Sequence, residues 1–160
     1  MKNYIKKYYM IYLIVIFVVA LDLITKQIFN DCNFSIINGV LSFTSSKNTG
    51  SAFSFFSDST LFLTIFSAVF LIVIILIDKL FKFKGNLYKT SYALIISGAI
   101  GNLVDRILFG YVRDFIRLDF FDFTGINTVF NVADIAIVAG ITLMIIYLVF
   151  FASKMEKKND

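Results

Sequence analysis

The chain has 160 residues and a formal net charge of +4, and 59% of its residues are hydrophobic while only 16% are charged. A soluble domain is about half apolar and about a quarter charged, so this composition predicts an integral membrane protein. With no histidine and one cysteine, the chain excludes Ser-His and Cys-His nucleophilic pairs, the H-E-x-x-H zinc helix and an intrachain disulfide, and it leaves aspartate as the main carboxylate for any catalysis.

Four apolar runs are each long enough to cross a membrane as a helix, since a span needs roughly 20 residues. They cover residues 8–29, 61–77, 90–109 and 129–152. Lipid tolerates only helices and closed barrels. We therefore predict an all-α transmembrane fold, a four-helix bundle that forms a single membrane domain over residues 1–160.

The first run contains two ionisable residues, Asp22 and Lys26, which lie one helical turn apart. An ionisable residue costs on the order of 3 kcal/mol at the centre of a span, so both are functional candidates. A simple ion pair between them explains the pattern equally well.

The segment after the first run has two β-leaning stretches, 35–37 and 40–44. They lie on either side of Asn38-Gly39, a dipeptide typical of a two-residue type I′ hairpin turn. This pattern predicts a small extracytoplasmic β-sheet between the first and second spans.

The third run carries a stripe of small and polar residues. Gly98, Gly101, Asn102 and Asp105 follow the i, i+3, i+4, i+7 spacing, so they share one helix face, and Arg106 comes next. The two glycines allow a neighbouring helix to approach closely.

The fourth run repeats the Asn-x-x-Asp pattern with Asn131 and Asp134. Asp105 lies five residues before Gly110, and Asp134 lies five residues after Val129. At 1.5 Å per residue, both carboxylates lie about 7.5 Å below the outer ends of antiparallel spans. We therefore expect the two aspartates to meet at one depth.

Lysines are concentrated in the N-terminal tail, the 78–89 loop and the C-terminal tail, which hold ten lysines against three acidic residues. The positive-inside rule assigns these segments to the cytoplasm, so segments 30–60 and 110–128 are predicted to be extracytoplasmic. The basic isoelectric point of about 9.1 then reflects membrane topology rather than nucleic-acid binding.

Two aspartates in one wet pocket favour a particular chemistry. Like charges a few Å apart cannot both ionise easily, so the pair holds one shared proton. The ionised carboxylate can take a proton from water while the protonated one donates to a peptide carbonyl, as in aspartic peptide hydrolysis. Asn102 and Asn131 would orient the carboxyl groups or the substrate, and Arg106 would pair with Asp114 or with a lipid headgroup.

Five segments, in order along nearly the whole chain, resemble the motifs of the bacterial lipoprotein signal peptidases, the signal peptidase II family. They are Asp22-Leu23-Ile24-Thr25-Lys26 (D-x-x-T-K), Asn48-Thr49-Gly50-Ser51-Ala52-Phe53 (N-x-G-x-A-F), Gly98 to Arg106 (G-x-x-G-N-x-x-D-R), Val112-Arg113-Asp114-Phe115 (V-x-D-F) and Phe130-Asn131-Val132-Ala133-Asp134 (F-N-x-A-D).

The resemblance implies an aspartic endopeptidase that removes the signal peptide from diacylglyceryl-modified prolipoproteins, cutting just before the modified cysteine, with no metal and no cofactor. It also implies a multi-pass protein of the bacterial cytoplasmic membrane, with both termini cytoplasmic and the active site near the outer leaflet. The expected partners are the lipid-modified prolipoprotein and membrane lipids, with no nucleic acid, and the expected state is a monomer.

By the same resemblance, Asp105 and Asp134 are the predicted catalytic pair. Substrate positioning or support of the pair is predicted for Asn48, Gly50, Asn102, Arg106 and Asn131. Structural or supporting roles are predicted for Asp22, Lys26, Gly98, Gly101, Asp114 and Ala133.

Two other classes of protein remain open on the residues alone. In a small ion- or proton-coupled transporter, Asp22, Asp105 and Asp134 would form a carboxylate relay, but these acids cluster near one membrane face. In an assembly subunit, the Gly98 and Gly101 stripe would pack against a partner helix. The substitution Asp105→Asn separates the three hypotheses. It should abolish peptide cleavage in a peptidase and pH-driven flux in a transporter, whereas an assembly subunit should tolerate it.

Overall fold

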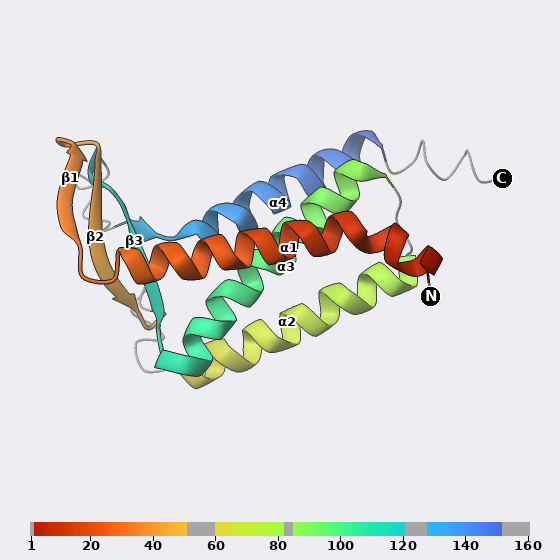
Figure 1. The fold of residues 1–160 in the computed structure, drawn as a ribbon, viewed down its shortest axis with the longest axis horizontal. Helices are drawn as coiled ribbons and strands as arrows, with labels where there is room; N and C mark the ends of the chain where they lie inside the picture. Colours follow the sequence, from red (N-terminus) through yellow and green to blue (C-terminus); the bar gives the residue numbers. More distant parts are fainter. Residues whose placement is uncertain (1, 51–59, 82–84, 121–127, 152–160) are drawn as a thin grey trace.

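The computed structural model describes residues 2–50, 60–81, 85–120 and 128–151. Its helices are α1 (Lys2–Ile28), α2 (Thr60–Phe81), α3 (Asn86–Phe109) and α4 (Val132–Phe150), and its strands are β1 (Asn33–Ile37), β2 (Leu41–Asn48), β3 (Val112–Leu118) and β4 (Val129–Phe130). The helices lie along the long axis of the molecule and the sheet stands across one end (Figure 1). The predicted fold class, a four-helix membrane bundle with a small sheet, is confirmed.

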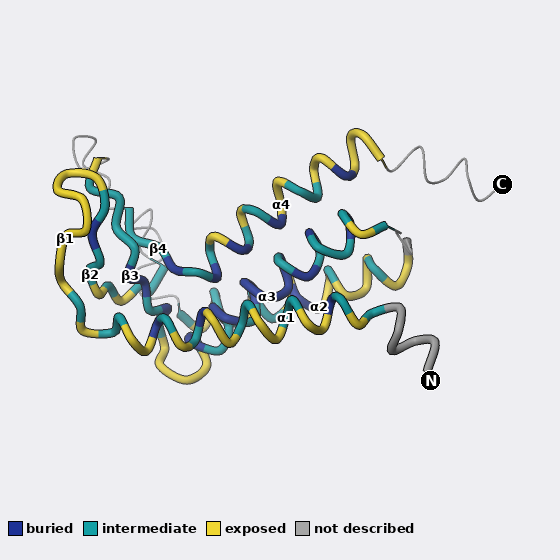
Figure 2. The backbone as a smooth tube through the Cα atoms, turned by 45° about the horizontal axis from the view of Figure 1, so that its top comes forward, coloured by how far each residue is buried: buried dark blue, intermediate teal, exposed yellow. Residues whose placement is uncertain are grey.

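All four helices are long and apolar enough to cross a membrane, with mean hydropathies from 1.4 for α3 to 3.0 for α2. Large apolar side chains such as Ile16 and Leu61 are exposed. Exposed positions recur along the helices of the tube in Figure 2. Such an apolar exterior would be unfavourable in water and is suited to lipid. The least apolar helix, α3, packs against the other three, which explains where its polar residues can be accommodated.

Glycine residues determine how closely the central helices pack. A Cβ atom added to Gly98 would collide with the backbone carbonyl oxygen of Ala133, and one added to Gly140 would lie 2.9 Å from the carbonyl oxygen of Ser91. A Cβ atom on Gly101 would lie 2.5 Å from Asp22 Oδ2. These contacts bring α4 and the carboxylate of α1 directly against the backbone of α3.

The helix bounds differ from the predicted runs at several ends, and at α4 the difference changes the type of secondary structure. The fourth run was predicted to begin at Val129, but Val129–Phe130 forms strand β4 and the helix begins at Val132. Asn131 is the N-cap of α4, so the helix cannot extend further back. The predicted end at residue 152 lies outside the described residues. The second span is longer than predicted, because α2 continues to Phe81.

The sheet is larger than predicted, because both of the segments predicted to be extracytoplasmic contribute strands. Its order is β1-β2-β3-β4, and every neighbouring pair is antiparallel. The charged residues of Val112–Leu118 hide the strand pattern of β3, and the short β4 was absorbed into the fourth apolar run. The predicted hairpin exists, but residues 38–40 form a three-residue loop, since Ile37 pairs with Leu41.

Aromatic side chains attach the sheet to the helices. The ring of Phe29, just after α1, lies 4.3 Å from the ring of Phe43 on β2 and 5.0 Å from that of Phe115 on β3, measured between centroids. Phe115 is buried. This cluster fixes β2 and β3 above the sheet-facing ends of the helices, where the polar residues predicted from the sequence are located.

Candidate active site

A cluster of buried polar side chains lies where the bundle meets the sheet. It draws two residues from α1, two from α3, one from β3 and one from the start of α4: Asp22, Lys26, Asn102, Asp105, Asp114 and Asn131. Asp134 in the first turn of α4 joins them and is half-buried. Burying this many polar groups is unfavourable unless each is paired, so their partners decide what each one can do.

The beginning of α4 fixes the position of Asp134. The Asn131 side chain accepts a hydrogen bond from the Asp134 backbone N–H at 2.9 Å, and the Asp134 Oδ2 atom accepts one from the Asn131 backbone N–H at 3.2 Å. This reciprocal capping box satisfies N–H groups at the start of the helix. Because the positive end of the helix dipole also favours a negative charge, the local sequence holds Asp134 in one orientation.

Two asparagine side chains connect the carboxylates of the cluster. Asn102 donates to Asp134 Oδ1 at 2.8 Å, while its Oδ1 atom accepts from Lys26 at 3.0 Å and from Asn131 at 3.2 Å. Asn131 also donates to Asp114 Oδ1 at 2.6 Å. Asn131 therefore contacts both Asp114, through its side chain, and Asp134, through its backbone.

Asp114 on β3 is buried and is held by amide groups. Asn48 on β2 donates to its Oδ2 atom at 2.9 Å, and the Oδ1 atom of Asn48 accepts from the Gly50 backbone N–H at 2.9 Å. Burial and the nearby negative charge of Asp134 raise the pKa of Asp114 to about 6, against the lowering effect of the Asn48 and Asn131 hydrogen bonds. Asp114 can therefore change its protonation state near neutral pH.

Asp105 has a different environment. It is fully buried, and Arg113 closes on it with the backbone N–H at 2.9 Å from Oδ2 and with Nη2 at 2.8 Å from Oδ1. Lys26 Nζ lies 3.4 Å from Asp105 Oδ2. Two cations thus contact this carboxylate, and together they occupy both of its oxygens.

Asp22 joins α1 to the start of α4. Its Oδ1 atom accepts a hydrogen bond from the Ala133 backbone N–H at 2.9 Å, and its Oδ2 atom forms an ion pair with Lys26 Nζ at 2.8 Å. The small residues Gly101 and Ala133 leave room for this carboxylate. The ion pair expected between Asp22 and Lys26 is present, and it extends to Asp105.

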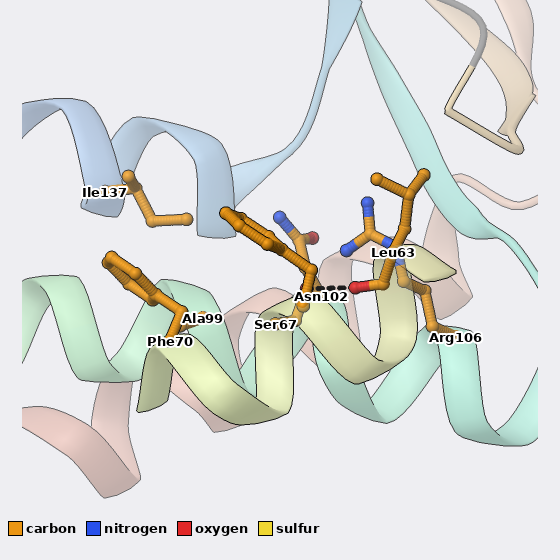
Figure 3. A pocket seen from close by; sticks show the side chains of 8 residues that line it. Leu63, Ser67, Phe70, Ala99, Asn102, Arg106 and Ile137 are labelled. Atoms are coloured by element: carbon orange, nitrogen blue, oxygen red, sulfur yellow. Dashed lines mark hydrogen bonds between the residues drawn. The ribbon is translucent and has the colours of Figure 1, made fainter. Parts of the chain in front are cut away.

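A cavity of about 300 Å³ opens beside the cluster, between α2, α3 and α4. Figure 3 shows Asn102 and Arg106 in the part of the cavity nearest the sheet, and Phe70, Ala99 and Ile137 in the deeper, apolar part. Arg106 was expected to pair with Asp114 or a headgroup, but within the described ranges it forms no ion pair. Its guanidinium group lines the cavity instead.

The depths predicted for Asp105 and Asp134 change once the helix bounds are known. Because α4 begins at Val132, Asp134 lies in the first turn, only about 3 Å along the helix axis. Asp105 lies a full turn inside α3, whose end at Gly110 leads directly into β3. It is Asp114 on β3 that shares the neighbour Asn131 with Asp134.

Sequence reasoning brought together most of this cluster but missed Arg113 and Gln27. Arg113 occupies the open position of the V-x-D-F pattern, so only its place directly before Asp114 could have drawn attention to it. Gln27 accepts a hydrogen bond from Arg113 Nη1 at 3.3 Å. The end of the N-x-G-x-A-F segment, residues 51–53, lies outside the described residues.

Comparisons with known proteins agree with these motifs. A family model described as "Signal peptidase (SPase) II" matches residues 14–150. The chain is 41% identical over 120 residues to the lipoprotein signal peptidase of Lactobacillus johnsonii, covering 75% of each chain. It is 39% identical over 140 residues to that of Caldicellulosiruptor bescii, covering 84% of this chain and 88% of the relative.

Solved structures show the same architecture. One described as a bacterial membrane enzyme matches with a TM-score of 0.77 and 32% identity, over 89% of this chain and 94% of that chain. A second with the same description matches with a TM-score of 0.77 and 31% identity, over 88% and 87% of the two chains.

Proposed function

The chain belongs to the signal peptidase II family, and on that premise we propose that Asp114 and Asp134 form its catalytic pair. The protein is a membrane endopeptidase that removes signal peptides from prolipoproteins. The scissile bond lies just before the lipid-modified cysteine of a diacylglyceryl-modified substrate. The transporter hypothesis is not favoured, because no relative named above is a transporter and the buried acids gather at one end of the bundle.

The observation that carries the assignment of the pair is the shared neighbour Asn131. It donates from its side chain to Asp114 at 2.6 Å and from its backbone to Asp134 at 3.2 Å. Among the described residues, no lysine or arginine forms an ion pair with either carboxylate. Asp105, which the sequence hypothesis paired with Asp134, is held by two cations and is therefore proposed as a buried anchor.

The proposed reaction uses one proton shared by the pair. The ionised carboxylate takes a proton from a water molecule, whose oxygen attacks the carbonyl carbon of the scissile peptide bond. The protonated carboxyl donates its proton to the carbonyl oxygen, which gives a neutral tetrahedral diol. When the diol collapses, the C–N bond breaks and the signal peptide is left with a C-terminal carboxyl group. The proton that was taken from water passes to the leaving amine of the modified cysteine.

Supporting roles follow from the contacts of each residue. Asn48, Asn102 and Asn131 orient the two carboxylates by hydrogen bonds of 2.6 to 2.9 Å, and Gly50 holds the Asn48 amide in place. Arg106 lines the cavity, where its donors can bind substrate carbonyl oxygens. Structural support comes from the close-packed set of Asp22, Lys26, Gly98, Gly101 and Ala133.

The membrane arrangement is also part of the proposal. Lysines in the tails and in the 78–89 loop support cytoplasmic termini, which puts the sheet and the catalytic pair at the outer leaflet of the bacterial cytoplasmic membrane. A substrate whose acyl chains remain in the bilayer presents its scissile bond near this depth. A monomer surrounded by membrane lipids suffices, because every residue assigned above comes from one chain.

The experiment that tests this function is cleavage of a diacylglyceryl-modified prolipoprotein by the purified protein in detergent. Wild-type protein is expected to release the signal peptide and to leave the unmodified precursor intact. Asp134→Asn is expected to slow cleavage by about 10³-fold, since it removes general acid or base function. Asp119→Asn, outside the cluster, serves as the matched control and should keep the wild-type rate. Folded wild-type protein that never cleaves this substrate would refute the assignment.

A further inference from the structure

We propose that Arg113 is a positioning residue for the peptidase reaction, holding the turn between α3 and β3 so that the carboxylate of Asp114 stays aligned with that of Asp134. This inference rests on the proposed catalytic pair. It concerns a residue that the family pattern V-x-D-F leaves open, and which the sequence alone did not single out.

Arg113 and Asp114 are neighbours on β3, so their side chains point to opposite faces of the strand. Asp114 faces Asn48 and Asn131. Arg113 faces back toward the helices, where it reaches Asp105 and Gln27. Any rotation or shift of the strand at Arg113 is therefore transmitted directly to Asp114 through the shared backbone.

The guanidinium group of Arg113 is held from three sides. Nη2 donates to Asp105 Oδ1 at 2.8 Å, and Nε lies 3.3 Å from both oxygens of the same carboxylate. Nη1 donates to Gln27 Oε1 at 3.3 Å. The Cζ atom lies 4.4 Å from the centroid of the Phe109 ring, a cation–π distance. A planar, forked donor set of this kind cannot be replaced by a single ammonium group.

The backbone makes the same connection. Gly110 ends α3 with φ of +79°, a left-handed conformation that lets the chain reverse and start β3 only two residues later. The Arg113 backbone N–H then donates to Asp105 Oδ2 at 2.9 Å. Both the backbone and the side chain of Arg113 therefore bind the carboxylate of Asp105, near the end of α3.

A second route leads from Arg113 to Asp134. Asp105 is shared by Arg113 and Lys26, and Lys26 also donates to Asn102 at 3.0 Å. Asn102 in turn donates to Asp134 at 2.8 Å. Without Arg113, Lys26 would be the only cation among the described residues that pairs with two buried carboxylates, those of Asp22 and Asp105, and would be drawn away from Asn102.

The test compares Arg113→Met and Arg113→Lys with wild type in the cleavage assay, at a temperature well below unfolding. Arg113→Met is expected to lower kcat by on the order of 100-fold with KM changed less than about threefold, because misplacement by about 1 Å has effects of this size. Arg113→Lys should have a kcat about tenfold higher than that of Arg113→Met, since it restores the charge but not the paired donors.

Arg117→Met is the matched control, because Arg117 lies on the same face of β3 but pairs with Asp119 instead. It should keep kcat within about twofold. A kcat of folded Arg113→Met within twofold of wild type would overturn the proposal. If that variant does not fold, Arg113→Lys decides alone: about a tenfold lower kcat supports positioning, and a wild-type kcat overturns it.

The outcomes also separate this inference from the proposed function. If wild type does not cleave the lipid-modified precursor, the proposed function fails before Arg113 is tested. If wild type cleaves and Asp134→Asn does not, while folded Arg113→Met cleaves at the wild-type rate, the function stands and only the role of Arg113 fails.

Discussion

The two halves of the buried polar cluster hold their carboxylates with different partners. In the ionic half, Asp22 and Asp105 are bound by Lys26 and Arg113. In the amide half, Asp114 and Asp134 are bound by asparagine side chains and backbone N–H groups: Asn48, Asn102 and Asn131. The two halves touch at Asn102, which accepts from Lys26 and donates to Asp134.

This difference is the basis on which we propose structural roles for one pair of carboxylates and a reactive role for the other. In the ionic half, both carboxylates are held in ion pairs, so charged donors occupy their oxygens. Neutral amides hold a carboxylate in place with a smaller effect on its pKa, and the pKa of Asp114 remains as high as about 6. The proposed catalytic pair thus consists of the two aspartates, of four in this region, that are held by amides rather than by cations.

The largest expected effect comes from the same substitution made in each half. Asp114→Asn should lower kcat by about 10³-fold and leave thermal unfolding nearly unchanged, because an amide can keep some of its hydrogen bonds but cannot transfer the proton. Asp105→Asn should instead lower the free energy of unfolding by about 3 kcal/mol, because it leaves Arg113 and Lys26 with a neutral partner. Both variants should be measured in the same detergent, by cleavage kinetics for kcat and by thermal unfolding for stability.

The comparison would fail if these two results were exchanged. A folded Asp105→Asn variant with no activity, beside an active Asp114→Asn variant, would restore the pair predicted from the sequence. Ala133→Ser, in the same cluster but without a charge, tests whether any polar change near Asp22 is equally harmful.

A smaller effect is expected for Asn131→Ala, which removes the shared neighbour of the amide half. Loss of the N-cap should cost about 1 kcal/mol of stability, and misalignment of the two carboxylates should lower kcat by roughly 10- to 100-fold. Asn131→Asp keeps a capping side chain but adds a negative charge beside Asp114. Equal stability of the two variants with wild-type kcat in both would show that Asn131 does not align the pair.

The sequence predicted the bundle well because apolar length is a strong signal in lipid. It located the ends of α1 and α3 closely, although both helices begin earlier than predicted, and it named every buried carboxylate of the cluster as a site residue. Where β structure meets a helix, the signal was weaker. Val129–Phe130 is as apolar as the helix after it, so only the capping geometry of Asn131 shows where α4 begins.

The choice between Asp105 and Asp114 depended on a contact that no local pattern contains. Asp105 and Asp134 share the Asn-x-x-Asp spacing on two helices, which made them look equivalent in the sequence. The equivalence ends when the chain reverses at Gly110 and brings Arg113 onto Asp105. That reversal also carries Asp114 to the Asn131 amide, so one turn determines the partners of both aspartates.

A further test concerns the packing that keeps the ionic half closed. In Gly101→Ala the new methyl group would lie 2.5 Å from Asp22 Oδ2, so the ion-paired Asp22 carboxylate must shift away from α3. Overpacking of this kind costs about 1–3 kcal/mol, with a loss of activity of only a few fold if the amide half stays intact. Thermal unfolding measures the first effect and kcat the second. Gly39→Ala, in the hairpin loop where an added Cβ meets no atom within 4 Å, is the control for activity. An unchanged unfolding temperature in Gly101→Ala would show that the ionic half tolerates expansion.

The smallest expected effect is a shift in pH dependence from Asn48→Ala. The pair works with one proton, so cleavage should fall as pH rises through about 6, the pKa of Asp114. Asp134 from α4 raises this pKa, while Lys26 from α1 and the hydrogen bonds of Asn48 and Asn131 lower it. Removing the Asn48 donor destabilises the ionised carboxylate and raises the pKa further, so the fall in rate should move to higher pH by about half a unit. Ser42→Ala on the same strand, whose hydroxyl binds Asp119 instead, should leave the profile in place. If the fall in rate moves to lower pH in Asn48→Ala, or does not move, the proton whose loss slows cleavage does not belong to Asp114.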